Sequence, residues 1–153
     1  MSYWLMKSEP EVFGIDHLKR RPDQSEPWDG VRNYQVRNML RDQMRPGDLA
    51  FFYHSNCEEP GIAGIMKVVG EARPDPSAFD PDAKYFDPRS DPANPRWYLV
   101  DMRYVRHLRR NIPLRELRQH AAQLDGLALL RKGSRLSIMP VSKEHWEYIL
   151  ELE

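Results

Sequence analysis

The sequence predicts one α+β domain, a small curved sheet of five or six short strands with helices between and around them. Short apolar runs bounded by turn residues recur along the chain, which is typical of buried strands. Helix-start signals stand between several of these runs. No internal repeat or low-complexity tract is present. The sheet is expected to be mixed or antiparallel, and the pattern does not give the strand order.

Residues 2–6 are expected to form the first strand because they are almost wholly apolar. Ser8 and Glu11 have the spacing of a capping box, so Ser8 is expected to cap a short helix. A polar loop is expected over residues 22–27. Asn33 is expected to cap a second helix, since apolar residues recur after it at helical spacing.

The second half of the chain continues in the same way. Residues 49–53 are apolar enough for a strand buried on both faces, and a further strand is expected over residues 62–69. Residues 97–105 alternate as a strand with one core face does. A short strand is expected over residues 136–139, and Ser142 is expected to cap the last helix.

The whole chain, residues 1–153, is expected to be a single domain. Residues 73–95 hold six prolines and too few apolar residues for a core of their own. Cys57 is the only cysteine, and no apolar run is long enough to span a bilayer. The first residues do not resemble a signal peptide. We therefore expect a cytoplasmic protein that does not bind membranes.

Net charge is zero, but the charges are unevenly distributed. Residues 103–135 contain nine basic and two acidic residues, whereas residues 71–101 contain seven acidic and four basic ones. A basic third of the chain can present a face that favours phosphate. A solvated arginine-rich surface explains the same composition equally well.

Two aromatic rings, a guanidinium and an amide surround a glycine turn in the segment Trp28-Asp29-Gly30-Val31-Arg32-Asn33-Tyr34-Gln35. Aromatic faces stack on any base, while Asn and Arg side chains hydrogen-bond to base edges. A tryptophan is usually a core residue, but the neighbours of Trp28 are polar or turn-forming. The wall of a ligand pocket is therefore favoured over simple packing.

Other segments carry polar groups that suit a ligand. His54, Ser55 and Asn56 follow a buried strand, where they line the rim of the sheet or simply shape a turn. Lys7 follows the first strand and can reach a phosphate or carboxylate. The segment from Arg131 to Arg135 is a compact basic turn, suited to backbone phosphates or to a helix C-terminus.

Catalysis has one candidate pair, Cys57 as nucleophile and His54 as base, both on one loop and without an identified orienting group. The histidines and the cysteine show no zinc spacing, and no phosphate-cradling glycine loop is present. No cofactor and no metal are expected, and a non-catalytic role is favoured.

Five motifs, in order and over nearly the whole chain, resemble the EVE domain family, which has bacterial and eukaryotic members. They are Tyr3-Trp4-Leu5-Met6-Lys7-Ser8-Glu9-Pro10, Trp28-Asp29-Gly30-Val31-Arg32-Asn33-Tyr34-Gln35, Phe51-Phe52-Tyr53-His54-Ser55-Asn56-Cys57, Asn94-Pro95-Arg96-Trp97-Tyr98 and Leu129-Leu130-Arg131-Lys132-Gly133-Ser134-Arg135-Leu136. The resemblance implies a PUA-like fold, a curved barrel-like sheet with helices around it. It also implies kinship with YTH domains, which hold a methylated adenine in an aromatic cage.

The same resemblance implies a pocket for a modified base. Trp28 is then one wall, and the second wall is Trp97, Tyr53 or Tyr85. The polar lining carried over by position comprises Lys7, Ser8, Asn33, Tyr34, Ser55 and Asn56.

The function that follows is non-catalytic binding of DNA or RNA that carries a modified base such as methylated cytosine, by a protein expected to be monomeric. Two alternatives stay open. One is an enzyme that acts on a nucleotide or RNA through Cys57 and His54, and the other is a module for a free nucleobase or an unrelated ligand.

Overall fold

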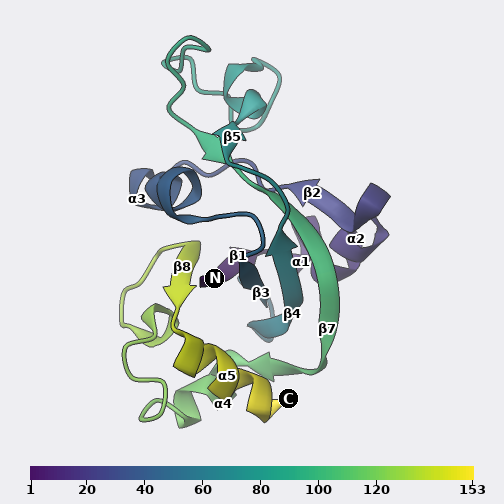
Figure 1. Ribbon diagram of the computed structural model, residues 1–153, viewed down its shortest axis with the longest axis vertical. Coiled ribbons are helices and arrows are strands. Elements are labelled where there is room, and N and C mark those ends of the chain that lie inside the picture. The colour runs from purple at the N-terminus through teal and green to yellow at the C-terminus, as the bar shows by residue number, and fades with distance from the viewer.

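The computed structural model describes residues 1–153 and contains a six-stranded sheet that curls into a half-barrel (Figure 1). The strand order is β2-β7-β4-β3-β1-β8. Only β1 and β3 pair in parallel, so the sheet is mixed. The six strands are β1 (Tyr3–Ser8), β2 (Ser25–Pro27), β3 (Leu49–His54), β4 (Gly61–Val68), β7 (Asp101–Pro113) and β8 (Ile138–Val141). The predicted α+β class with a PUA-like curved sheet is confirmed.

Short helices surround this sheet. Figure 1 shows α4 and α5 together at one end of the half-barrel, with α1 and α2 beside β2 and β7. None of the helices has the length and apolar character that crossing a bilayer requires. The helices are α1 (Pro10–Phe13), α2 (Ile15–Arg20), α3 (Tyr34–Asn38), which continues as a π-helical turn over Met39–Gln43, α4 (Leu114–Gln119) and α5 (Lys143–Leu152).

The central strands are buried on both faces, because alternate residues of a strand point to opposite sides of the sheet. Trp4 and Met6 of β1 join one cluster of 18 buried residues, whereas Leu5 between them joins a second cluster of 15. The second cluster includes α5, whose Trp146 stacks on Phe51 of β3 with ring centroids 3.8 Å apart. The sheet therefore lies between two hydrophobic cores.

Two predicted helix caps are confirmed and one is wrong. Asn33 accepts a hydrogen bond from Val36 N at 3.0 Å at the start of α3, and Ser142 caps α5. Ser8, in contrast, is the last residue of β1, because pairing with β3 extends as far as residue 54. Its hydroxyl donates to Phe13 O at 2.6 Å, and Glu9 precedes α1 instead.

Two strand boundaries also differ from expectation. The loop expected over residues 22–27 contains edge strand β2, because its residues pair with β7. The strand expected over residues 97–105 is interrupted at Val100, whose carbonyl accepts a hydrogen bond from Trp28 N at 2.8 Å. Beyond that point β7 continues to Pro113, since its pairing with β4 lasts to Gly61 across two register shifts.

A small lobe projects beyond the end of the half-barrel and is drawn at the top of Figure 1. At its base β5 (Arg73–Pro74) pairs with β6 (Tyr98–Leu99). The lobe is held by polar contacts: the indole N–H of Trp97 donates to Asp87 Oδ2 at 2.6 Å, and the buried Asp75 donates its N–H to Trp97 O. This lobe carries Tyr85 back toward the turn that contains Trp28.

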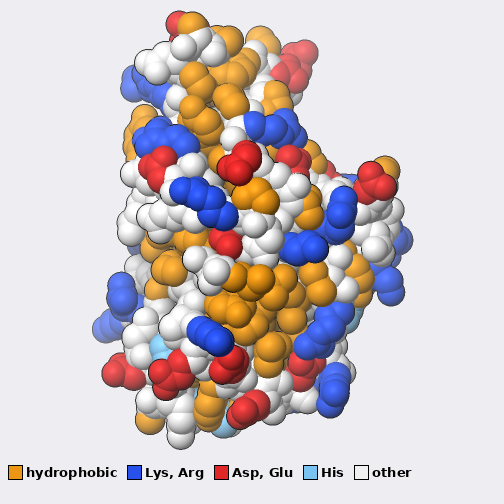
Figure 2. All heavy atoms as spheres, viewed as in Figure 1, with side chains coloured by type: hydrophobic (Ala, Val, Ile, Leu, Met, Phe, Trp, Pro, Cys, Tyr) orange, Lys and Arg blue, Asp and Glu red, His pale blue; other side chains and the backbone are white.

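The basic third of the chain does not form a uniformly basic surface. On the face drawn in Figure 2, Lys and Arg side chains are interspersed with Asp and Glu side chains around an apolar area. Three of its arginines are paired with carboxylates, in the ion pairs Arg106–Glu153, Arg110–Glu116 and Arg115–Glu59. Four of its cations without an ion pair, Arg118, Arg131, Lys132 and Arg135, line the cavities described below.

The last residue stabilises the fold in a pH-dependent way. Two hydrogen bonds from Arg106, at 2.8 and 2.6 Å, outweigh burial and, with Arg109 N, lower the pKa of Glu153 to about 2. An unfolded glutamate has a pKa of about 4.3. The stabilisation is therefore complete above about pH 4.3 and is lost as pH falls toward the folded pKa.

We expect Glu153→Gln to lower the free energy of unfolding at pH 7 by about 1 kcal/mol, a modest loss because Arg106 is partly exposed. Urea unfolding of wild type and variant at pH 7 and pH 3 measures the difference. The two proteins should converge toward the acid end. A difference that is the same at both pH values would contradict the assigned pKa.

Candidate functional site

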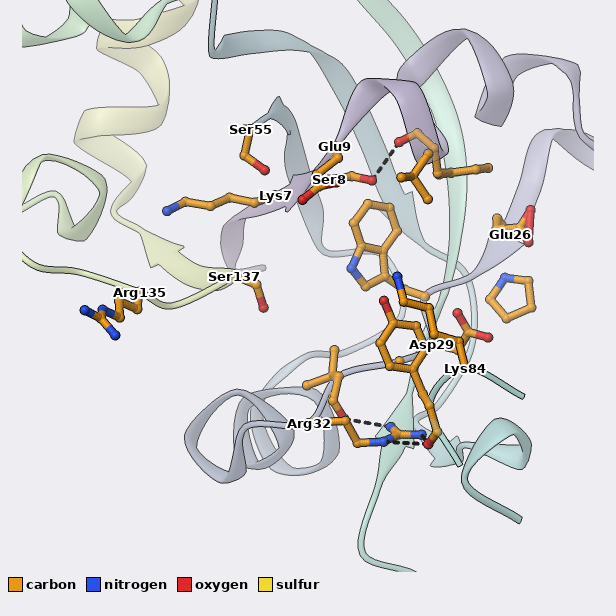
Figure 3. Close-up of a pocket in the computed structure, with 17 residues that line it drawn as sticks. Lys7, Ser8, Glu9, Glu26, Asp29, Arg32, Ser55, Lys84, Arg135 and Ser137 are labelled. Carbon is orange, nitrogen blue, oxygen red and sulfur yellow. Dashed lines mark hydrogen bonds between the residues drawn. The ribbon is translucent and has the colours of Figure 1, made fainter. Parts of the chain in front are cut away.

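A cavity of about 600 Å³ opens between the end of β1, the turn after β2 and the lobe. Ligand pockets usually have volumes of about 300–1,000 Å³, so this one is large enough for a small planar group. Figure 3 shows the side chains that surround it. The residues that line the cavity are Lys7, Ser8, Glu9, Val12, Phe13, Glu26, Pro27, Trp28, Asp29, Gly30, Val31, Arg32, Ser55, Lys84, Tyr85, Arg135 and Ser137.

Trp28 is both a core residue and a wall of this cavity. The residue is only 9% exposed, and its ring packs edge-on against Phe52 and Phe13, at centroid distances of 5.5 and 6.4 Å. No buried side-chain nitrogen in the protein lacks a hydrogen-bond partner. The indole N–H of Trp28 has no protein partner, so it faces the open cavity, unlike that of Trp4, which donates to Asp48 Oδ2 at 3.0 Å. The contacts with Phe13 and Phe52 fix the orientation of the Trp28 indole.

Tyr85 is a further aromatic ring of the cavity, beside Trp28 and Phe13. Of the three residues expected as a possible second wall, it alone lines this cavity, and it is 40% exposed. Its ring lies against the backbone of Gly30, where an added Cβ would stand 2.6 Å from Tyr85 Cε2. Gly30 also has a φ of +79°, which glycine adopts without strain. The positive φ and the close approach of Tyr85 together favour glycine at this position of the Trp28 turn.

Arg32 ties the Trp28 turn to the lobe and does not present a free guanidinium to the cavity. Its Nε and Nη2 donate to Tyr85 O at 3.1 and 2.6 Å, and Nη1 donates to Asp75 Oδ2 at 3.1 Å. Nη2 also donates to Ser77 Oγ, and Nη1 to Val31 O. With these donors engaged, Arg32 positions the backbone of Tyr85.

Asp75, whose side chain is fully buried, accepts the hydrogen bond from Arg32 Nη1 and so anchors the contact between the turn and the lobe. Burial raises the pKa of its carboxyl, but hydrogen bonds from Ser77, Gly30 N and Arg32 together outweigh burial and leave the pKa below its usual value. The carboxylate is therefore charged at neutral pH and holds both the Gly30 turn and Arg32 in place.

The charged and hydroxyl groups of the lining differ between the two sides of the cavity. In Figure 3, Lys7, Ser55, Ser137 and Arg135 lie on one side, and Asp29 and Lys84 on the other. Burial lowers the pKa of Lys7. Burial, followed by repulsion from Asp75, raises the pKa of Asp29. A ligand in this cavity would meet Lys7 and Arg135 on one side, and Asp29 together with Lys84 on the other.

Several residues expected at the site have other contacts. Asn33 caps α3, and Tyr34 stacks on Trp97 outside the cavity, with centroids 4.8 Å apart. The Nε2 atom of His54 accepts a hydrogen bond from Ile15 N at 3.2 Å. Asn56 donates to Glu9 Oε1 at 3.0 Å on the rim. The structure brings together Lys7, Ser8, Trp28, Arg32, Ser55 and Arg135 around the first cavity, whereas Tyr53 and Arg131 line a neighbouring one.

Sequence reasoning missed Asp29, Lys84 and Ser137 in the lining and Asp75 beneath it. Lys84 and Asp75 lie in the proline-rich segment, which has no apolar periodicity to place it in the fold. Asp29 was visible as part of the Trp28 turn, and that neighbourhood was the one available signal.

The proposed catalytic pair has no supporting geometry. The hydrogen bond from Ile15 N uses the Nε2 lone pair of His54, and burial lowers the pKa of this imidazole. No hydrogen bond joins Cys57 to His54, and no group of three or more His, Cys, Asp or Glu residues is placed to hold a metal ion.

A curled mixed sheet with short helices around it and an aromatic-walled cavity at its rim is the architecture of the PUA-like fold. Within that class the chain belongs to the EVE domain family, whose model matches residues 2–152. The resemblance drawn from the five motifs is confirmed.

Relatives and solved structures agree with this assignment. Human thymocyte nuclear protein 1 is 46% identical over 99% of this chain and 74% of its own length. A crystal structure of that human protein in complex with DNA containing 5-methylcytosine superposes with a TM-score of 0.95, covering 99% of this chain and 97% of that one. A Pseudomonas syringae protein of known structure is 50% identical, with a TM-score of 0.92 and 99% of each chain covered.

Proposed function

We propose that this protein is a non-catalytic module that binds DNA carrying a modified base, with that base held between Trp28 and Tyr85. The single observation that carries the proposal is this cavity, in a chain 46% identical to a human protein crystallised with DNA containing 5-methylcytosine. What that protein binds is the reason to test methylated cytosine first. The cytoplasmic location and monomeric state expected from the sequence stay predictions.

The physics of the cavity supports a single extruded base. Taking a base out of the duplex costs a few kcal/mol. Stacking on an aromatic side chain returns about 1–3 kcal/mol, and Trp28 is already oriented before binding. The unpaired indole N–H and the hydroxyls of Ser55 and Ser137 are available to the edge of the base. Two aromatic groups and a preformed lining therefore offset the cost of extrusion.

A methyl group adds a small further gain. Burial of one methyl stabilises a complex by about 0.8 kcal/mol, which corresponds to about a fourfold change in Kd. The expected preference for a methylated over an unmethylated base is therefore modest, unless the two rings enclose the methyl closely.

Tyr85→Ala tests the assignment of the second wall. Tyr85 is 40% exposed, so removal of its ring is expected to leave the fold intact, and loss of one stacking partner should weaken binding about tenfold. The measurement is fluorescence anisotropy with a labelled duplex that carries one 5-methylcytosine.

Tyr34→Ala is the matched control, because Tyr34 is 52% exposed and stacks on Trp97 outside the cavity. Its Kd should stay close to that of wild type. Equal losses in the two variants, or none in Tyr85→Ala, would refute the proposed wall. A single-stranded RNA with the same modification, run in parallel, tests DNA against RNA.

A further inference from the structure

A second cavity, of about 570 Å³, lies next to the first. All the charged residues that line it are cations. It contains no carboxylate, whereas the first cavity is lined by Glu9, Glu26 and Asp29 as well as by cations. An anion entering the second cavity meets no acidic side chain. The charged and polar residues that line it are Lys7, Tyr53, Arg118, Arg131, Lys132 and Ser134.

The cations of this second cavity have no carboxylate partner. Other arginines of the same third of the chain are paired: Arg110 with Glu116, for example, and Arg115 with Glu59. Arg118 lies on the same helix as Arg115 and has no ion pair in the protein, and neither have Arg131 and Lys132. Unpaired cations gathered around one hollow are suited to an external anion.

Tyr53 supplies a second and independent observation. The residue is only 3% exposed, yet its hydroxyl has no hydrogen-bond partner in the protein. Because no buried polar side-chain atom lacks a partner, this hydroxyl opens on the cavity that Tyr53 lines. Burial raises the pKa of Tyr53 to about 12, so the hydroxyl keeps its proton at neutral pH and can donate it in a hydrogen bond.

The two cavities are continuous in their lining. Lys7 lines both, with its ammonium 5.9 Å from the centroid of the Tyr53 ring. The basic turn after residue 130 separates them: Arg131, Lys132 and Ser134 line the second cavity, and Arg135 lines the first. A strand whose base occupies the first cavity can pass over Lys7 into the second.

We propose that the second cavity binds a backbone phosphate of the same strand, next to the extruded nucleotide, through Lys7, Tyr53, Arg118 and Arg131. This inference rests on the proposed function, because it places the phosphate relative to a base in the first cavity. Phosphate contacts give affinity without sequence information, whereas base contacts discriminate. The first cavity selects the base, and the second holds the strand.

Salt dependence measures these phosphate contacts directly. For each phosphate that the protein no longer neutralises, the slope of log Kd against log salt should fall by about 0.7–0.9. We expect Arg118→Gln and Arg131→Gln each to lower the slope by about this amount and to weaken binding of methylated and unmethylated duplexes by the same factor, on the order of fivefold at low salt. The preference for the methylated duplex should not change.

Arg115→Gln is the matched control, since Arg115 lies on the same helix but pairs with Glu59 outside the cavity. Its slope should equal that of wild type. Unchanged slopes for Arg118→Gln and Arg131→Gln, or an equal fall in all three variants, would overturn the phosphate site. Weakening by Arg118→Gln at an unchanged slope would also overturn it. Failure of the proposed function shows separately, as equal binding of the two duplexes by wild type.

Discussion

Trp28→Ala is expected to abolish measurable preference for a methylated base and to weaken DNA binding by about 10- to 100-fold. The Trp28 indole is a wall of the cavity, and the rings of Phe13 and Phe52 hold it in place. Its removal takes away the stacking surface and also leaves a cavity in the core. Anisotropy titration with a methylated duplex measures the binding loss.

The same substitution also destabilises the fold, because a buried tryptophan cut back to alanine costs about 3–5 kcal/mol. Trp28→Phe separates the two effects. A phenylalanine keeps most of the contact with Phe52 but offers a smaller face and no N–H, so binding should fall by about tenfold in a folded protein.

Trp146→Phe, in the other core cluster, is the control for replacing a buried tryptophan away from the cavity. Its affinity for the methylated duplex should match that of wild type. If Trp28→Phe binds as wild type does, the indole is a packing residue and not a wall of a base pocket.

Arg32→Ala is expected to cost about 3–5 kcal/mol of stability, because it leaves the buried Asp75 carboxylate without its cation. It also removes both hydrogen bonds that hold the Tyr85 carbonyl. We therefore expect weaker binding of methylated DNA even under conditions where the variant is folded. Urea unfolding and anisotropy titration measure the two effects.

Arg73→Ala is the comparison, since Arg73 pairs with Asp101 in an exposed ion pair at the base of the same lobe. Such a pair contributes about 0–1 kcal/mol. The double variant Arg32→Ala with Asp75→Ala should recover part of the lost stability, because no buried charge is left alone. Similar losses of stability for Arg32→Ala and Arg73→Ala would show that removing Arg32 does not leave Asp75 as an uncompensated buried charge.

The parts of the fold that the sequence predicts are those decided by local chemistry. Asn33 and Ser142 cap their helices as expected, because a side-chain oxygen at the first position satisfies a free N–H. The strands over residues 49–53 and 62–69 are long apolar runs with few alternatives. Ser8 had an equally good local pattern, but pairing between β1 and β3 extended the strand through it.

Only part of the candidate site could be predicted from the sequence, because only part of it has a local sequence pattern. Trp28 stands in a polar turn, which marks it as a candidate wall from sequence alone. Tyr85 lies far from it along the chain, in a segment without periodicity, and polar contacts such as those from Arg32 to its carbonyl hold it at Gly30. Tyr34, adjacent to the turn in sequence, stacks on Trp97 instead. Long-range polar contacts of this kind leave no local pattern.

The most direct test of the account is the affinity of the wild-type protein for two duplexes that differ only in one methyl group. Fluorescence anisotropy should give a Kd about fourfold lower for the duplex with 5-methylcytosine than for the duplex with cytosine. The ratio should persist as salt is raised, because phosphate contacts are common to both duplexes. Equal affinity for the two at every salt concentration would contradict the claim that the cavity between Trp28 and Tyr85 recognises a modified base.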